Sequence, residues 1–292
     1  MASASTSLIE SAKRAACVQA VAENFDATFR YVGIGSGSTI AYVVEAIAGL
    51  GPGVTSGMRF VPTGAGSAAL VRGAGLTALS VPELLALEPG PAPSPAAENV
   101  PHRPIDIYFD GADEVDPELN CIKGGGACLF QEKLVARLAR RFVCVADSRK
   151  RAPRLLTHWA YVPVEVAPAA AEYARRELAR LGSVDPTIRT VPAAADGAAP
   201  APLVTDNHNY IVDAPFPALL LNAEADQLDP ARGRWTPDAL LARIRQVFGV
   251  LEVGIFAGLD GPTAAAQGPD AEGVRPVKAY FGRPDGEVET LG

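Results

Sequence analysis

Three short segments combine glycines with polar side chains, and they are the part of the sequence best suited to chemistry. They span residues 33–39 (GIGSGST), 110–114 (DGADE) and 123–127 (KGGGA), and Glu132 follows the last one closely. A carboxylate can remove a proton next to a carbonyl, while a lysine and backbone N–H groups stabilise the resulting enediolate oxygen. All three histidines lie outside these segments, so the sequence shows no Ser-His-Asp or Cys-His arrangement.

The first segment is suited to holding a phosphate group. Its glycines permit a tight turn, and Ser36, Ser38 and Thr39 offer hydroxyl groups before a predicted helix with free N–H groups. The spacing is neither GxGxxG nor that of a P-loop, which disfavours a dinucleotide site. The alternative is a tight turn with a serine N-cap, and the segment alone does not decide between the two.

The second segment crowds three carboxylates at the end of an apolar strand. Asp110, Asp113 and Glu114 should repel one another, which raises the pKa of at least one of them. Such a perturbed cluster is typical of acid–base chemistry. Two alternatives stay open, namely a site for a divalent metal ion and a turn with a solvated acidic face.

The third segment places three successive glycines after Lys123. Glycine runs are costly in conformational entropy, but they allow several N–H groups to point at one anion. Glu132 falls in the first turns of the following predicted helix. The alternative is a flexible loop with a surface lysine and a first-turn glutamate that the helix dipole favours.

Strands and helices must position these segments. The apolar runs 29–34, 105–109 and 142–146 each end in a polar or glycine-rich turn, which predicts a parallel sheet with ligands at the carboxyl ends of its strands. Further helices are expected at 7–24, 40–47, 67–73, 131–141, 168–181 and 237–247, and further strands at 59–62, 76–79, 161–166, 187–191, 203–205, 210–213, 250–256 and 277–281.

Two domains are expected, because regular alternation of strands and helices ends after Lys150. Residues 1–155 and 257–292 should form a Rossmann-like α/β domain with a mostly parallel sheet and helices on both faces. Residues 156–256 should form a smaller α+β domain. The Ala/Pro-rich stretches 88–100 and 192–202 are expected to be surface insertions, since they carry too little apolar surface to order themselves.

Composition excludes several classes of function. The chain has 292 residues and a formal net charge of −7, and its basic residues are scattered, so no nucleic-acid partner is expected. Its four cysteines form no CxxC pair, which disfavours a zinc site and favours free thiols in a reducing compartment. There is neither a secretory h-region nor an apolar run of ~18 residues, so we expect a soluble cytoplasmic protein without a membrane partner.

Four motifs in this order resemble the type A ribose-5-phosphate isomerases. They are GIGSGST, DGADEVDPELNCIKGGGACLFQEKLVA, FVCVADSRK and VTDNHNYIVD, and the resemblance runs from about residue 7 to the C-terminus except for the two insertions. The details are closer to the eukaryotic branch. The resemblance implies a Rossmann-like main domain, a ferredoxin-like smaller domain and isomerisation of ribose 5-phosphate in the pentose phosphate pathway. It also implies a homodimer or homotetramer that uses no cofactor and no metal.

The resemblance also implies roles for individual residues. Glu132 matches the proton-transferring glutamate, Asp110 and Asp113 match aspartates that line the sugar, and Lys123 matches the lysine that contacts its oxygens. The implied substrate contacts are Ser36, Gly37, Ser38, Thr39, Gly111, Ala112, Gly124, Gly125, Gly126, Lys150 and, on the first helix, Lys13.

Two positions depart from the family pattern. Ser36 replaces the usual threonine and keeps its hydroxyl, so the replacement should be tolerated. His208 replaces the usual glycine of a turn in the smaller domain, and we expect an effect on that loop rather than on the chemistry. Two other functions are alternatives. A non-catalytic sugar-phosphate sensor would not need the full set of acidic and basic residues. A nucleotide-dependent oxidoreductase is disfavoured by the missing GxGxxG spacing and by the lack of a ribose-binding acid after the second strand.

Overall fold

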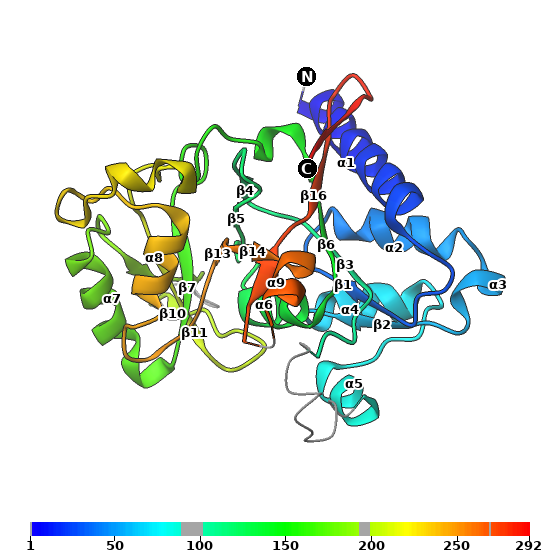
Figure 1. Cartoon of the computed structure of the whole chain (residues 1–292), viewed down its shortest axis with the longest axis horizontal. Helices are drawn as coiled ribbons and strands as arrows, with labels where there is room; N and C mark the ends of the chain where they lie inside the picture. Colours follow the sequence, from blue (N-terminus) through cyan, green and yellow to red (C-terminus); the bar gives the residue numbers. More distant parts are fainter. Residues whose placement is uncertain (1, 89–101, 193–198, 269) are drawn as a thin grey trace. The chain divides into compact units, whose positions relative to one another are not determined.

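The computed structural model describes residues 2–88, 102–192, 199–268 and 270–292 (Figure 1). The chain divides into two compact units. Unit 1 comprises Met1–Ala112, Gln131–Arg151 and Gly258–Gly292, and unit 2 comprises Asp113–Phe130 and Ala152–Ala257. The first expected insertion lies outside the described residues except for Glu88, and the second lies partly outside them.

Unit 1 is built on a six-stranded sheet with the order β17-β16-β6-β3-β1-β2. Every neighbouring pair is parallel except β16 and β17, which confirms the expected mostly parallel sheet. Because β1, β3 and β6 run in one direction, their carboxyl ends lie at the same edge. The strands are β1 (Tyr31–Ile34), β2 (Arg59–Pro62), β3 (Ile107–Asp110), β6 (Phe142–Asp147), β16 (Lys278–Gly282) and β17 (Val288–Leu291).

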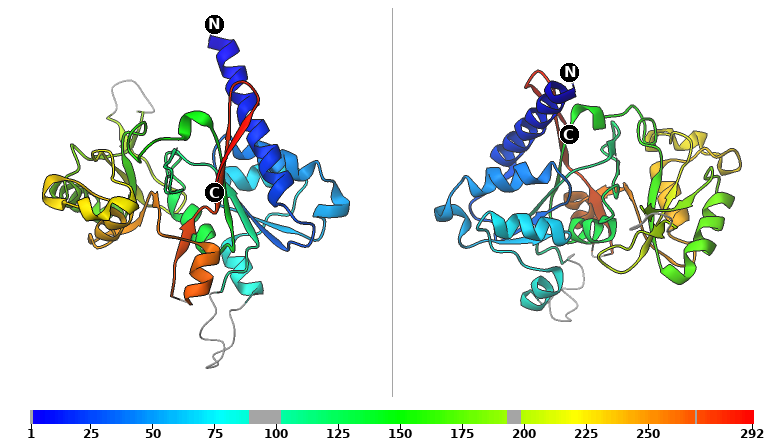
Figure 2. Two further views of the ribbon diagram at one scale, coloured as in Figure 1. Left: turned by 45° about the horizontal axis from the view of Figure 1, so that its top comes forward. Right: turned by 180° about the vertical axis from the view of Figure 1, so that it is seen from behind.

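Helices cover both faces of this sheet. On one face, α1 (Ala2–Asn24), α2 (Ile40–Ala48) and α4 (Ala65–Gly73) share a core with alternate strand residues such as Val32 and Phe109. On the other face, a Cβ at Gly33 would lie 2.8 Å from Val135 of α6 (Leu129–Leu138), so this helix packs directly on β1. Figure 2 shows α1 in blue alongside the red C-terminal strands, which it contacts.

Unit 2 contains a four-stranded antiparallel sheet with the order β12-β7-β11-β8. With α7 between the first two strands and α8 between the last two, the chain order is βαββαβ, the ferredoxin-like arrangement that was expected. Apolar side chains from both helices and from β7, β11 and β12 form its core. The elements are β7 (Val162–Val166), α7 (Ala171–Arg180), β8 (Thr187–Ile188), β11 (Tyr210–Ala214), α8 (Pro237–Ile244) and β12 (Val250–Val253).

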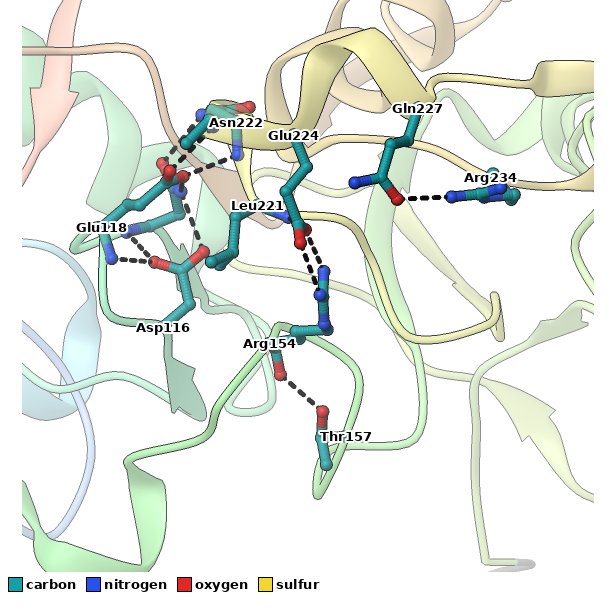
Figure 3. Close-up of polar contacts among 11 residues, drawn as sticks. Asp116, Glu118, Arg154, Thr157, Leu221, Asn222, Glu224, Gln227 and Arg234 are labelled. Atoms are coloured by element: carbon teal, nitrogen blue, oxygen red, sulfur yellow. Dashed lines mark hydrogen bonds and ion pairs between the residues drawn. The ribbon is translucent and has the colours of Figure 1, made fainter.

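A small sheet and a polar network complete unit 2. The sheet has the order β13-β5-β4 and consists of β13 (Ile255–Phe256), β5 (Cys121–Ile122) and β4 (Glu114–Val115). The turn after β4 is held by Asp116, which accepts hydrogen bonds from the N–H groups of Glu118 and Asn120, both at 2.9 Å. Glu118 in turn accepts the N–H of Asn222 at 2.7 Å, at the start of η3 (Asn222–Gln227) (Figure 3).

Several sequence predictions of elements were wrong or incomplete. Residues 76–79 make only an isolated bridge at Ala78, and 203–205 form no strand, because pairing occurs instead between β9 (Thr190–Val191) and β10 (Ala201–Pro202). The unpredicted helix α5 (Val81–Leu87) begins at Ser80 with a full capping box. The other elements not predicted are α3 (Pro52–Thr55), β4, β5, β10, β14 (Leu259–Asp260), α9 (Gly261–Gln267), β15 (Gly273–Arg275), β17, η1 (Ser148–Lys150), η3 and η4 (Pro230–Arg232).

In the described part of the chain, no helix combines the length and the apolar character that a membrane crossing requires.

Candidate active site

Ser36 connects two of the expected site carboxylates within unit 1. It follows β1, its hydroxyl donates a hydrogen bond to Oε1 of Glu132, and its N–H donates to Oδ1 of Asp110 at 3.1 Å. Glu132 lies in the first turn of α6 and is 4% exposed, while Asp110 ends β3 and is fully buried. The structure therefore brings together residues that are up to 96 positions apart in the chain.

Asp110 is held in place by further groups. Tyr108 donates its phenol hydrogen to Oδ2, and the N–H of Gly111 donates to Oδ1 at 2.7 Å. Tyr108 was not among the predicted site residues, because it lies in an apolar strand and is itself fully buried. A usable signal was present, since residues two apart in a strand point to the same face.

Gly35 is required by this arrangement. A Cβ at this position would lie 1.9 Å from Oδ1 of Asp110, so only glycine allows β1 to end this close to the carboxylate. The glycine at this position of the first segment is therefore explained by steric contact within the site, in addition to any contact with a ligand.

Residues 37–39 form a turn, and the Lys13 side chain of α1 lies beside it. Gly37 has a φ of 92°, and the Lys13 ammonium donates to the Ser38 hydroxyl at 3.0 Å and to Glu10 at 2.8 Å. The hydrogen bond from Lys13, followed by one from Tyr42, holds the pKa of Glu10 below its usual value. The side chain of Thr39, the residue before α2, makes no capping hydrogen bond.

Lys150 ends the short helix η1 (Ser148–Lys150), directly after β6. Since β6 pairs in parallel with β3, with Cys144 opposite Asp110, Lys150 follows a strand that ends at the same edge as Asp110. In η1 the Asp147 carboxylate caps the N–H of Arg149 and also binds its guanidinium. Burial would raise the pKa of Asp147, but these contacts outweigh it and lower the pKa.

Ala112 is the last residue of the first segment of unit 1, and unit 2 carries the remaining predicted residues. The Asp113 carboxylate accepts the N–H of Gly125 at 2.7 Å, which ties the second and third segments together. Lys123 is 3% exposed, and its ammonium lies 5.4 Å from the centre of the Phe256 ring, a cation–π contact. Gly124 has a φ of 101°, a conformation that favours glycine. Gly126 is exposed, and a Cβ there would meet nothing within 4 Å.

The contacts of Glu114 contradict the prediction that the second segment forms one acidic cluster. Its carboxylate is 1% exposed and accepts the N–H groups of four successive residues, 156–159. Backbone donors therefore compensate its charge, and Glu114 has a structural role in unit 2. Among the residues that the structure describes, no three His, Cys, Asp or Glu side chains gather as metal ligands would.

Comparison with known proteins shows the family of the chain. The family model of ribose 5-phosphate isomerase A (phosphoriboisomerase A) matches residues 94–268. The chain is 41% identical to the ribose-5-phosphate isomerase of Mycosarcoma maydis, over 98% of this chain and 82% of that one. It is 43% identical to that of Eremothecium gossypii, over 97% and 93% of the two chains.

Solved structures of isomerases resemble the whole chain. A D-ribose-5-phosphate isomerase in complex with phospho-erythronic acid aligns with a TM-score of 0.71 and 28% identity, over 97% of this chain and 98% of that one. The ribose 5-phosphate isomerase of Plasmodium falciparum aligns with a TM-score of 0.70 and 25% identity over the same shares. Since sequence and fold match over nearly the whole length of this chain, the chain belongs to the ribose 5-phosphate isomerase A family.

Proposed function

We propose that this protein interconverts D-ribose 5-phosphate and D-ribulose 5-phosphate in the non-oxidative pentose phosphate pathway, with Glu132 as the group that moves the proton. The observation that carries the residue assignment is the contact of Ser36 with both Glu132 and Asp110 at the carboxyl edge of the parallel sheet. Ligands of open α/β sheets collect at this edge. A buried carboxylate fixed by a hydroxyl is suited to act as a general base.

The reaction proceeds through an enediolate. The Glu132 carboxylate removes the proton from C2 of the open-chain aldose, and the electrons of that C–H bond form the double bond between C1 and C2. The carbonyl oxygen on C1 takes the negative charge, and the hydroxyl proton on O2 moves to O1. Glu132 then returns its proton to C1 as the C2 carbonyl forms. No electrons enter or leave, so the scheme needs no redox cofactor.

Lys123 and the glycine loop are assigned to the negative charge of the enediolate. A buried ammonium is effective for this because little water competes with it. The position of Lys123 is restrained by its own N–H, which donates to the Gly254 carbonyl at 2.9 Å, and by the Phe256 ring. Asp113 supports the same loop through Gly125.

Asp110 is assigned to the hydroxyl proton and to ring opening, and it also positions Ser36. Both of its oxygens accept hydrogen bonds from the protein. The phosphate is assigned to residues 36–39, the start of α2 and Lys13, and Lys150 is assigned as a further binding cation. The Lys13–Ser38 contact supports this assignment.

The test is conversion of ribose 5-phosphate by the purified protein in the presence of EDTA. Glu132→Gln keeps the volume and an acceptor for Ser36 but removes the base, so kcat should fall by about 10²–10⁴-fold. Glu172→Gln, on the outer side of α7, is the matched control and should keep full activity. Loss of wild-type activity in EDTA would instead indicate a metal site, and near-normal turnover of Glu132→Gln would refute the base assignment.

Self-association is a further proposal. Phe248 is 78% exposed and pairs edge-on with Tyr173, which is 52% exposed, so unit 2 presents an apolar patch that a second copy could cover. Light scattering should show a dimer or tetramer, and Phe248→Asp should shift it toward the monomer if this patch is the interface. The cytoplasmic location stays a prediction, which cell fractionation would test.

A further inference from the structure

Arg189 of unit 2 binds the glycine loop through its backbone carbonyls. Its Nη1 donates to the Gly124 oxygen at 3.0 Å and to the Gly125 oxygen at 3.1 Å. The opposite edge of the guanidinium binds both oxygens of Asp213, at 2.9 and 2.5 Å. Both side chains are only 12% exposed, so water competes little for these contacts.

These contacts determine which way the loop N–H groups point. In a trans peptide the N–H points away from the preceding carbonyl. With the Gly124 and Gly125 carbonyls directed at Arg189, the N–H groups of Gly125 and Gly126 are directed away from it. The first of them meets Asp113 at 2.7 Å, and the second belongs to an exposed glycine with open space beside its Cα. One peptide group is therefore held at both ends.

The anchor of this arrangement is the ferredoxin-like sheet. Asp213 lies on β11, opposite Pro163 of β7 and Thr187 of β8, so it sits on an interior strand of the sheet. Tyr161 places its ring 5.7 Å from the Arg189 guanidinium carbon. Only a guanidinium can bind two carbonyls on one edge and a carboxylate on the other, because lysine has no planar fork.

We propose that the Arg189–Asp213 pair positions the loop of residues 124–126 so that the N–H group of Gly126 faces the charge that develops on the substrate. The inference rests on the substrate role proposed above for this loop. It makes Arg189 and Asp213 positioning residues, which act through the loop. It also gives the ferredoxin-like sheet a part in positioning the loop.

The test compares Arg189→Lys with Arg175→Lys. Arg175 on α7 forms the same two-bond fork with Glu172, both contacts at 2.8 Å, so it controls for loss of an arginine–carboxylate pair. The readouts are kcat, KM, the melting temperature and the dissociation constant of phospho-erythronic acid, the ligand of a similar solved structure, which is tested here as an inhibitor. The carboxylate of this inhibitor resembles the enediolate. Arg189→Lys should lower kcat by about 10- to 100-fold, since small misplacements of positioned groups cost that much. The substitution should also weaken the binding of the inhibitor by a larger factor than it raises KM.

Two outcomes would overturn the proposal. One is a folded Arg189→Lys protein with the wild-type kcat and inhibitor affinity. The other is an equal loss of kcat and inhibitor affinity in Arg175→Lys, which would point to a general effect on unit 2. If Arg189→Lys does not fold, Asp213→Asn keeps the shape of the anchor and should show the same split between kcat and KM. Glu132→Gln separates the two claims, because an inactive Glu132→Gln beside a normal Arg189→Lys would refute only the positioning role.

Discussion

Ser36 shows how a single small side chain organises the chemistry at the residue scale. Its N–H and its hydroxyl bind different carboxylates, so Asp110 and Glu132 are fixed relative to each other without a direct contact between them. The family pattern has threonine here. Serine and threonine both carry a hydroxyl group, and it is this group that binds Glu132. The sequence-based expectation that serine is tolerated therefore has a physical reason, and it stays a prediction for activity.

Gly35 provides a sharp test of the Asp110 position. In Gly35→Ala the new Cβ would overlap the Asp110 carboxylate, which must then leave Ser36 and Tyr108. We expect activity to fall by about 100-fold, because the positioned groups shift, together with a loss of about 1–3 kcal/mol in the free energy of unfolding. Steady-state kinetics and urea unfolding would measure both.

Gly73→Ala is the matched control for this substitution. Gly73 ends α4, and a Cβ there would meet nothing within 4 Å. The variant should keep its kcat and change in stability by less than about 1 kcal/mol. Equal activity of Gly35→Ala and Gly73→Ala would contradict the account of Asp110.

At the scale of elements, the turn after β4 contains a buried acid with an unusual titration. Burial raises the pKa of Asp116 to about 6, although hydrogen bonds from Asn120 and Glu118 act in the opposite direction. Its ordinary value is 3.8, so the folded chain binds the proton more tightly than the unfolded chain does. The contribution of Asp116 to stability is therefore largest in acid and is lost as the pH rises from about 4 to about 6.

Asp116→Asn removes this titration. The free energy of unfolding of the wild type, minus that of the variant, should fall by up to about 3 kcal/mol between acid and neutral pH. Asp26→Asn is a control of opposite sign, because hydrogen bonds from Thr28 lower the pKa of Asp26. Urea unfolding across this pH range would measure both, and a difference that does not change with pH would refute the assigned titration.

The elements also show where sequence reasoning reaches its limit. The strands that end at Ile34, Asp110 and Asp147 were predicted because apolar runs that stop at polar turns have a strong local signal. The role of Glu114 had no such signal. It was expected to repel Asp110 and Asp113, yet it turns to four N–H groups more than forty residues further along the chain. Contacts of this kind depend on tertiary structure.

At the scale of the whole molecule, the predicted site residues are divided between the two units. Ser36, Asp110 and Glu132 belong to unit 1, while Asp113 and Lys123 belong to unit 2. The sequence-based division kept residues 113–130 with the larger domain. In the structure this segment pairs through β5 with β13. This pairing has no local signal in the sequence.

The TDNHN turn illustrates the same limit within unit 2. Thr205 and Asn209 donate hydrogen bonds to the buried Glu165 at 3.0 and 2.9 Å, so the motif serves the interior of the sheet. His208, where the family has glycine, adopts a φ of 62°. The expectation that this replacement concerns the loop agrees with this location. Arg189 was not predicted, because its partners at residues 124 and 125 lie 65 and 64 positions away.

The most direct test of the central claim follows the transferred proton itself. Ribose 5-phosphate carrying deuterium at C2 would be converted by the wild type and by Glu132→Gln, and the product would be examined by NMR. We predict that the wild type removes deuterium from C2, with part appearing at C1 and part in water, while Glu132→Gln leaves it on C2. Removal of the C2 deuterium by Glu132→Gln at the wild-type rate would contradict the assignment of Glu132 as the base.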